Sequence, residues 1–444
     1  MNPLGISLIA IAAALILTAR PDKAAMGLMF GICYITQGQQ IDIAGFNFDA
    51  IRILLLLGVI RVIARRELQQ IAPFPLDKWL AAYPLVVFAV TTIARGSETL
   101  AYYAGVNYNV LFSYFVFRSL LRTREDILSF LSMLGIFIVP LALFMLFESA
   151  TGYNFFKLLG GIKDSPAMRE GSYRCQGSFR ISITAGCFGA TLVPIFVGLY
   201  LAGIGRARAV TGIVAGLVIT LTSNSSGPLM ALINGMAAWG LWRFRSEMRM
   251  VRWLMVAIFG LLSLVMNAPV YYLIARVGDF VGGGGWHRAR LIEQFINHYD
   301  RWWLWGTTET RDWMPTVLVI GDRVGADITN KFIGVGIEGG LLALLIFIGI
   351  FVVAYQGLGR ALQVARSQQS PAEWVWWGLG CTLFGHIMAI TSVQYWDQME
   401  IAFYMALAVI GGVAGMAQSE QGAVSGDSQE IAPISTFGSA SVNQ

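Results

Sequence analysis

Arginine side chains gather in two long polar segments of the chain, residues 151–180 and 269–329, and each segment runs into an apolar stretch. Arginine suits phosphate, because its planar guanidinium donates two parallel hydrogen bonds to one anion. The segments therefore predict a binding site for a phosphate-bearing ligand. The alternative is that the charges only make two loops soluble. The arginines assigned to this site are Arg174 and Arg180 in the first segment, and Arg288 and Arg290 in the second.

The sequence around these arginines also favours an anion. Arg180 directly precedes an apolar run, so it would lie at a helix N-terminus, where free N–H groups and the helix dipole attract negative charge. Arg288 and Arg290 fall in the first turn of an amphipathic helix predicted over residues 286–305, which follows four glycines at 282–285. A glycine hinge before a basic helix start would form a cradle for phosphate. This helix would lie in the membrane interface, and ordinary solvated charges are the alternative explanation of its arginines.

Ionisable residues next to or inside the apolar runs are candidates for proton transfer. Asp327 lies just before the chain enters such a run, and it is the candidate general base. Other potential proton acceptors in this segment include His287 and His298, although none of them stands in a diagnostic motif. Ionisable residues at membrane depth are functional candidates by default. These are Glu148, Glu338 and Arg52, of which Arg52 is assigned to the phosphate site.

The elements that must position these residues are predicted to be membrane-spanning helices. Of the 444 residues, 56% are hydrophobic and 13% are charged, whereas soluble domains carry about 25% charged residues. Apolar runs close to the length of a spanning helix recur along the whole chain and predict an all-α polytopic membrane bundle of about 12–13 helices. The runs are 4–19, 24–36, 51–64, 79–94, 101–121, 127–150, 181–203, 209–222, 229–242, 253–268, 330–355, 374–392 and 401–416.

The positions of Lys and Arg predict how the bundle is oriented. They concentrate in alternate short loops, which the positive-inside rule places in the cytoplasm. The long loops 151–180 and 269–329 then lie outside, as does the N-terminus. The bundle spans residues 1–416, and residues 417–444, rich in Ser, Gly, Ala and Gln, are predicted to form a disordered cytoplasmic tail. The net charge of +5 does not indicate a nucleic-acid partner, because the basic residues lie in short loops between helices.

Several kinds of active site are missing from the sequence. It contains no P-loop, no glycine-rich nucleotide motif, no H-E-x-x-H and no G-x-S-x-G, which argues against an ATP-driven pump and the familiar hydrolases. It also lacks C-x-x-C spacing and paired acidic metal motifs, so neither a metal nor another cofactor is predicted.

Four short motifs, in this order and at these places in the topology, resemble those of the O-antigen ligase and Wzy-type polysaccharide polymerase superfamily. The likeness covers roughly residues 174–345. The motifs are Arg174-x-x-Gly177-x-Phe179; Leu221-Thr222-x-Asn224-Ser225-Ser226-Gly227; Arg288-x-Arg290 followed by Trp303-Leu304-Trp305-Gly306; and Asn330-Lys331-Phe332 followed by Glu338-Gly339-Gly340-Leu341.

Two positions depart from the family pattern. Ser226 stands where the family has an arginine, and Thr329 stands where it has its catalytic histidine. The role of that histidine is therefore not carried over to this chain. Either Asp327 or another acidic group replaces it, or the chemistry of this branch is altered.

The resemblance implies a GT-C-like bundle that transfers a glycan at the periplasmic face of a bacterial inner membrane. The donor would be a glycan on undecaprenyl diphosphate, and the acceptor a sugar or a lipid. No metal or cofactor is implied, and other polysaccharide assembly proteins are potential partners. Ligase and polymerase remain open alternatives. The residues that would bind the diphosphate or support the reaction are Arg174, Arg180, Arg288, Arg290 and Arg52, with Asp327 as base and His298, Asn330 and Glu338 as supporting groups.

Two other functions are compatible with the sequence. One is a transporter or flippase for a lipid-linked glycan or another anionic solute, which would place charged groups near the membrane midplane on broken helices in matched halves. The other is a non-catalytic membrane component of a polysaccharide export complex, which the missing histidine keeps open.

Overall fold

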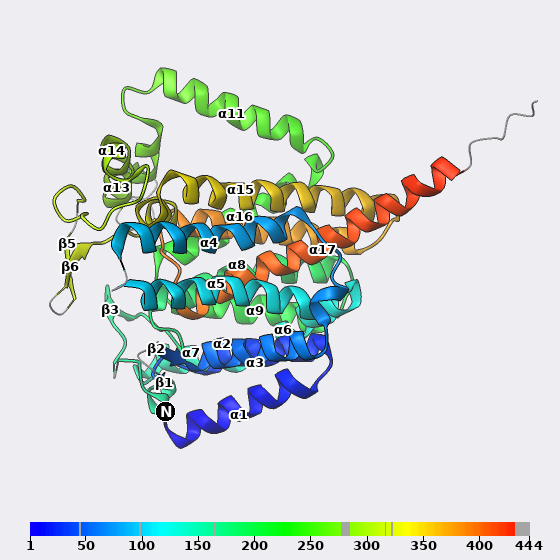
Figure 1. Cartoon of the computed structure of the whole chain (residues 1–444), viewed down its shortest axis with the longest axis horizontal. Coiled ribbons are helices and arrows are strands. Elements are labelled where there is room, and N and C mark those ends of the chain that lie inside the picture. The colour runs from blue at the N-terminus through cyan, green and yellow to red at the C-terminus, as the bar shows by residue number, and fades with distance from the viewer. Residues whose placement is uncertain are drawn as a thin grey trace, which may run out of the picture.

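The chain folds into a bundle of helices that lie side by side (Figure 1), which confirms the predicted all-α class. The computed structural model describes residues 1–43, 46–96, 99–163, 165–276, 285–315, 317–320 and 323–430. Within these ranges, six helices are long and apolar enough to cross a membrane by length and composition. Three two-stranded antiparallel hairpins are the sheet structure of the described residues: β1–β2 (Gln40–Ile43, Phe46–Asp49), β3–β4 (Met168–Arg169, Ser172–Tyr173) and β5–β6 (Val317–Ile320, Arg323–Ala326).

Every apolar run predicted to be a helix is helical in the structure. One run is divided, because residues 127–150 form two helices that meet at Ile138, just before Pro140. The helices of the bundle are α1 (Pro3–Thr18), α2 (Pro21–Tyr34), α3 (Ala50–Ala64), α4 (Pro75–Arg95), α5 (Leu100–Leu120), α6 (Arg124–Phe137), α7 (Val139–Thr151), α8 (Ser182–Leu201), α9 (Arg206–Thr222), α10 (Ser226–Gly240), α11 (Met248–Val265), α15 (Lys331–Ser367), α16 (Ala372–Ile390) and α17 (Asp397–Glu430).

Local sequence explains where several helices begin. Pro3, Pro21 and Pro75 each stand at the first turn of a helix, where their fixed φ suits the helix and the missing N–H costs nothing. Asp49 caps α3 by accepting a hydrogen bond from the backbone N–H of Arg52. Such caps set helix ends independently of the tertiary packing.

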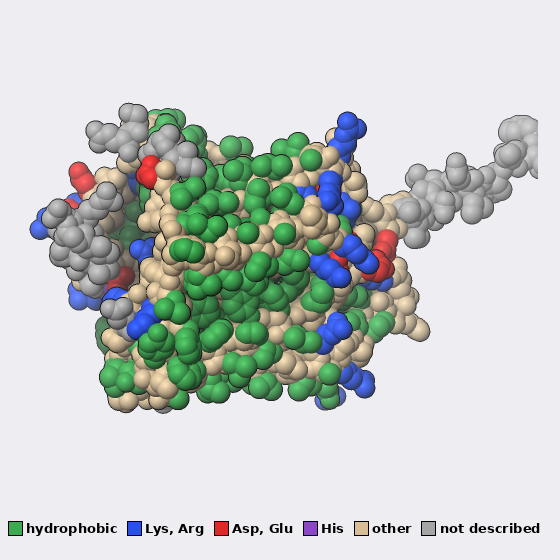
Figure 2. All heavy atoms as spheres, turned by 90° about the horizontal axis from the view of Figure 1, so that it is seen from below, with side chains coloured by type: hydrophobic (Ala, Val, Ile, Leu, Met, Phe, Trp, Pro, Cys, Tyr) green, Lys and Arg blue, Asp and Glu red, His purple; other side chains and the backbone are tan. Residues whose placement is uncertain are grey.

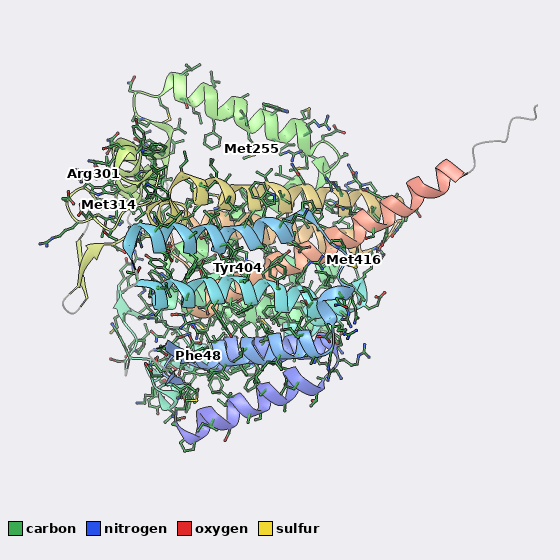
Figure 3. All side chains as sticks on the ribbon, viewed as in Figure 1. Phe48, Met255, Arg301, Met314, Tyr404 and Met416 are labelled. Atoms are coloured by element: carbon green, nitrogen blue, oxygen red, sulfur yellow. The ribbon has the colours of Figure 1, made fainter. Side chains whose placement is uncertain are left out.

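The centre of the bundle is built around α8 and the apolar part of α17, which are almost wholly buried. Small residues let backbones approach closely there: a side chain added at Gly189 would lie 2.7 Å from the carbonyl oxygen of Gly216, and one at Gly378 would lie 2.7 Å from that of Pro194. Figure 3 shows Tyr404 of α17 in the middle of the bundle. By contrast, α11 has no buried residue and stands at the edge of the bundle (Figure 1).

The two ends of the bundle differ. The N-terminus, the three hairpins and the helices of residues 285–302 lie together at one end, which we call the loop end (Figure 1). Figure 2 shows an apolar band across the middle of the molecule, with charged side chains at both ends. The two long polar segments thus share one end, as the orientation rule predicts. Which side of a membrane that end faces stays a prediction.

The C-terminal segment differs in part from the expected disordered tail. Helix α17 continues to Glu430, past residue 417, where the tail was predicted to begin. Gln368 of the α15–α16 connection donates a hydrogen bond of 2.8 Å to Glu420, so this part of the helix also contacts the bundle. Residues 431–444 lie outside the described ranges, as do glycines 282–284 of the predicted hinge.

Candidate functional site

The predicted amphipathic helix of the second long loop is present, but as two helices. They are α13 (Gly285–Asn297) and α14 (Tyr299–Trp302), separated at His298. The apolar face of α13 packs on the bundle: Leu291 and Phe295 share a buried cluster with Ile333 and Ile337 of α15. This face is therefore covered by protein, whereas the sequence alone predicted that the helix would lie in the membrane interface.

Arg288 stands in the first turn of α13 as a half-buried cation. Among the described residues it makes no hydrogen bond or ion pair, and its burial lowers the pKa of its guanidinium. An arginine nevertheless stays charged at neutral pH. Arg290, one residue further on, is exposed and has no ion pair with any described residue. Arg288 is thus a partly buried positive charge without a counter-ion among the described residues.

A histidine and an aspartate meet beside Arg288. His287 Nε2 lies 3.2 Å from the backbone oxygen of Asp327, which follows the hairpin β5–β6. Two residues later, the hydroxyl of Thr329 is buried without a hydrogen-bond partner among the described residues. The sequence named His287 only as one of several potential proton acceptors, because nothing local indicates that it reaches a residue 40 positions away.

Arg174 is a second arginine without an acidic partner in the described part of the chain. Its backbone N–H donates to the carbonyl of Ala167 at 2.8 Å, and its Nη2 donates to Ser225 Oγ at 2.8 Å. Its Nε is buried and has no hydrogen-bond partner in the described part of the chain. Burial, and then the nearby charge of Arg169, lower the pKa of Arg174. One donor of this guanidinium is therefore not satisfied by any described residue.

The segment that carries Arg174 is held by Glu148 at the end of α7. The carboxylate of Glu148 accepts the backbone N–H groups of Gln176 at 3.2 Å and Gly177 at 3.0 Å. Asn154 adds a hydrogen bond of 2.8 Å to the carbonyl of Gly177. Glu148 was predicted to be functional because of its depth, and the structure shows it fixing the backbone next to a candidate ligand-binding arginine.

The guanidinium groups of Arg180 and Arg52 already contact carboxylates of the protein. In this they differ from those of Arg174 and Arg288. Arg180 is largely exposed and lies 3.5 Å from the carboxylate of Asp397, at the start of α17. The second arginine, Arg52, has three partners. They are Asn109 Oδ1 at 3.1 Å, the carbonyl of Asn47 at 2.6 Å and the carboxylate of Asp49 at 3.9 Å.

Glu338 belongs to a buried charge cluster that we define as Arg95, Lys331, Glu338 and Glu400. Lys331 Nζ lies 3.0 Å from Glu400 Oε1, and both side chains are buried. The charges of Lys331 and Arg95 act on Glu338. The cluster thus contains two basic and two acidic side chains, so its formal charges cancel. The sequence pointed to Glu338 but missed Glu400, although a glutamate at the edge of an apolar run is a signal of the same kind.

A break in α15 brings two of the four motifs together. Gly340 has φ 70° and ψ −171°, which interrupts the helix. The N–H of Leu341 donates to the carbonyl of Trp303 at 2.7 Å, and the N–H of Thr307 donates to that of Ile337 at 2.8 Å. The segments 303–306 and 338–341, 35 residues apart in each case, therefore lie against each other in the fold.

Asn330 and His298 serve local structure. The side-chain oxygen of Asn330 caps α15 by accepting the N–H groups of Phe332 at 2.9 Å and Ile333 at 3.3 Å. His298 Nδ1 lies 3.0 Å from the carbonyl of Gln294, and its ring packs against Trp313. Their predicted supporting role in a reaction stays a prediction.

No protein-family model and no curated protein matches the chain. Within the described ranges, no three His, Cys, Asp or Glu side chains are grouped so that they could hold a metal ion. The chemistry that the site offers is therefore read from its own side chains. Those are two arginines without acidic partners among the described residues, a histidine that contacts the backbone of Asp327, and a buried charge cluster.

Proposed function

We propose that this chain is a membrane glycosyltransferase that takes a glycan from an undecaprenyl-diphosphate-linked donor and polymerises or ligates it. It would be a GT-C-like bundle of about 12–13 spanning helices in a bacterial inner membrane, with its loop end on the periplasmic side. One observation carries the proposal. Arg174 and Arg288 come from the two long loops at the same end, and both are partly buried cations without carboxylate partners among the described residues.

The reaction would need these cations at its leaving group. The acceptor hydroxyl attacks the anomeric carbon of the donor sugar, and the bond from that carbon to the diphosphate oxygen breaks. The bonding electrons leave with the diphosphate, and the acceptor's proton passes to a base. Cations placed in advance stabilise the charge that develops on the diphosphate. Because the donor already stores the energy, the reaction needs no nucleotide.

His287 joins Asp327 as a candidate for the base. When its Nε2–H donates to the carbonyl of Asp327, the ring is held in the tautomer in which Nδ1 is the basic nitrogen. A histidine would then act near position 329, where the family histidine is missing. The carboxylate of Asp327, half-exposed, is the competing base.

A second candidate function, a transporter or flippase for a lipid-linked glycan, is favoured by the break in α15. Transporters place broken helices next to buried ionisable groups, and Gly340 interrupts α15 two residues after Glu338. The glycosyltransferase is preferred because the charge cluster at this break is balanced, whereas the unpaired cations lie in the loops. A non-catalytic role in an export complex remains the third possibility.

The proposal is tested with the full chain in lipid nanodiscs and a synthetic polyprenyl-diphosphate oligosaccharide as donor. We expect release of polyprenyl diphosphate together with a longer or transferred glycan. Arg288→Gln and Arg174→Gln should each lower turnover by about a hundredfold or more. Arg311→Gln, an equal charge change at an exposed position of the same loop, is the matched control. Movement of intact donor between leaflets without bond cleavage would instead support the flippase.

The two candidate bases are separated by single substitutions. His287→Gln and Asp327→Asn should differ in effect, because only the base removes a proton from the acceptor. Loss of turnover in His287→Gln, with much of it kept in Asp327→Asn, assigns the role to the histidine. The reverse result assigns it to the carboxylate, and full activity in both variants removes this pair from the mechanism.

A further inference from the structure

The end of the bundle opposite the loop end carries a cavity of about 540 Å³ between α6 and the start of α9. Its polar lining comes from Ser129 and Ser132 of α6, and from the turn Gly205-Arg206-Ala207-Arg208 that opens α9. None of these residues belongs to the site proposed above.

The first turn of α9 makes this cavity electropositive. Arg206 and Arg208 are exposed and form no ion pair with a described residue. The first backbone hydrogen bond of the helix runs from the N–H of Ala209 to the carbonyl of Gly205 at 3.0 Å. The N–H groups before Ala209 have no partner within the helix. Two guanidinium groups and a helix N-terminus at one cavity are suited to an anion.

Ser132 supplies an independent sign that something binds here. The residue is 5% exposed and lines the cavity, yet its hydroxyl forms no hydrogen bond with any described residue. A side chain buried to this degree is held in place by its neighbours, and its free hydroxyl faces the cavity that it lines. Gly205 has φ 56°, and a Cβ at this position would lie 2.6 Å from Ser132 Oγ. A glycine is therefore needed for the turn of α9 to approach this hydroxyl.

One carboxylate lies close to the cavity, and protein groups already contact it. Ser129 Oγ donates to Asp22 Oδ2 at 2.8 Å, and Arg20 Nε lies 3.8 Å from Asp22 Oδ1, an oxygen that is buried without a hydrogen bond. Asp22 thus has a neighbouring arginine of its own. The positive charges of Arg206 and Arg208 are left for a ligand.

We infer that this cavity binds a phosphate group, donated either by the headgroup of an anionic phospholipid or by free phosphate. The guanidinium groups of Arg206 and Arg208 hold the phosphate oxygens, the N-terminus of α9 adds backbone donors, and Ser132 Oγ donates to one more oxygen. The arginines of the cavity stand at the start of α9, and charged side chains gather at both ends of the apolar band (Figure 2), where the headgroups of a bilayer would be found.

The full chain, purified in a neutral detergent, is titrated with three probes by calorimetry. They are inorganic phosphate, dihexanoyl phosphatidylglycerol and the zwitterionic dihexanoyl phosphatidylcholine. We expect one of the first two to bind more tightly than the third. Saturable binding by inorganic phosphate identifies a free-phosphate site, and binding by phosphatidylglycerol alone identifies a headgroup site. If neither anionic probe binds more tightly than phosphatidylcholine, the inference is overturned.

Variants then locate the binding. The double variant Arg206→Gln/Arg208→Gln should weaken binding of the anionic probe about tenfold or more, and Ser132→Ala should weaken it about threefold to tenfold. The matched control is Arg243→Gln/Arg249→Gln, which removes two exposed arginines at the same end. Equal losses in the two double variants would show that the probe senses general surface charge, and an unchanged affinity in Arg206→Gln/Arg208→Gln would also overturn the site.

Discussion

Lys331 Nζ lies 3.0 Å from Glu400 Oε1, so a buried ion pair joins the first turn of α15 to the first turn of α17. Lys331→Met leaves the carboxylates of Glu400 and Glu338 without their cation in a buried site. We expect this variant to lose about 3–5 kcal/mol of stability, the usual cost of removing one partner of a buried pair. Denaturant unfolding of the purified protein measures the loss.

A double variant provides the control for this pair. Lys331→Met/Glu400→Gln removes both charges, so it should be more stable than Lys331→Met alone. If the single and double variants are equally destabilised, the two side chains are not coupled, and the contact between α15 and α17 depends on packing alone.

Gly340 is predicted to be the residue of α15 that tolerates substitution least. Its φ of 70° lies in the left-handed region, and an added Cβ would lie 2.6 Å from the carbonyl oxygen of Leu304. Gly340→Ala should therefore cost about 1–3 kcal/mol and release the segment 303–306 from the helix. Gly359→Ala is the control, because it lies in the same helix with open space around its Cα. Equal melting temperatures for the two variants would contradict this account.

Glu148 is predicted to order the segment that carries Arg174. Glu148→Gln keeps the shape of the side chain but removes its charge and one acceptor, which weakens the bonds from Gln176 and Gly177 by about 1–3 kcal/mol in total. Hydrogen exchange of these two amides should then become faster by about tenfold or more. Glu170→Gln, an exposed carboxylate of the same loop, should leave both rates unchanged. Unchanged rates in Glu148→Gln would show that other contacts hold the segment.

The orientation of the bundle is predicted to expose the two ends on different sides of a membrane. The four native cysteines are buried, and burial raises the pKa of the Cys175 thiol to about 12, so they should react little with maleimide near neutral pH. Ser165→Cys introduces a thiol at the loop end, and Ser246→Cys introduces one at the opposite end. In intact cells whose outer membrane has been permeabilised, an impermeant maleimide should label the variant at position 165 alone. Labelling of position 246 alone would reverse the topology and remove the periplasmic site.

The helices and their ends were predictable because they depend on local properties of the chain. A backbone in an apolar environment must satisfy its own hydrogen bonds, so each long apolar run becomes a helix. Prolines, capping side chains and clusters of basic residues then mark where helices begin and end. For the same reason the sequence predicted that the loops holding Arg174 and Arg288 lie at the same end of the bundle, because four apolar runs separate them.

Tertiary structure alone decided which charged side chains have partners within the protein. Arg174 and Arg180 stand six positions apart and look alike in sequence, yet Arg180 meets Asp397 while a buried nitrogen of Arg174 meets no described acceptor. The helix break at Gly340 and the contact of His287 with Asp327 could not be predicted from the sequence either. Each of these features depends on a partner far away in the chain. Hydropathy and spacing report only on near neighbours, whereas long-range partners are chosen when the helices pack.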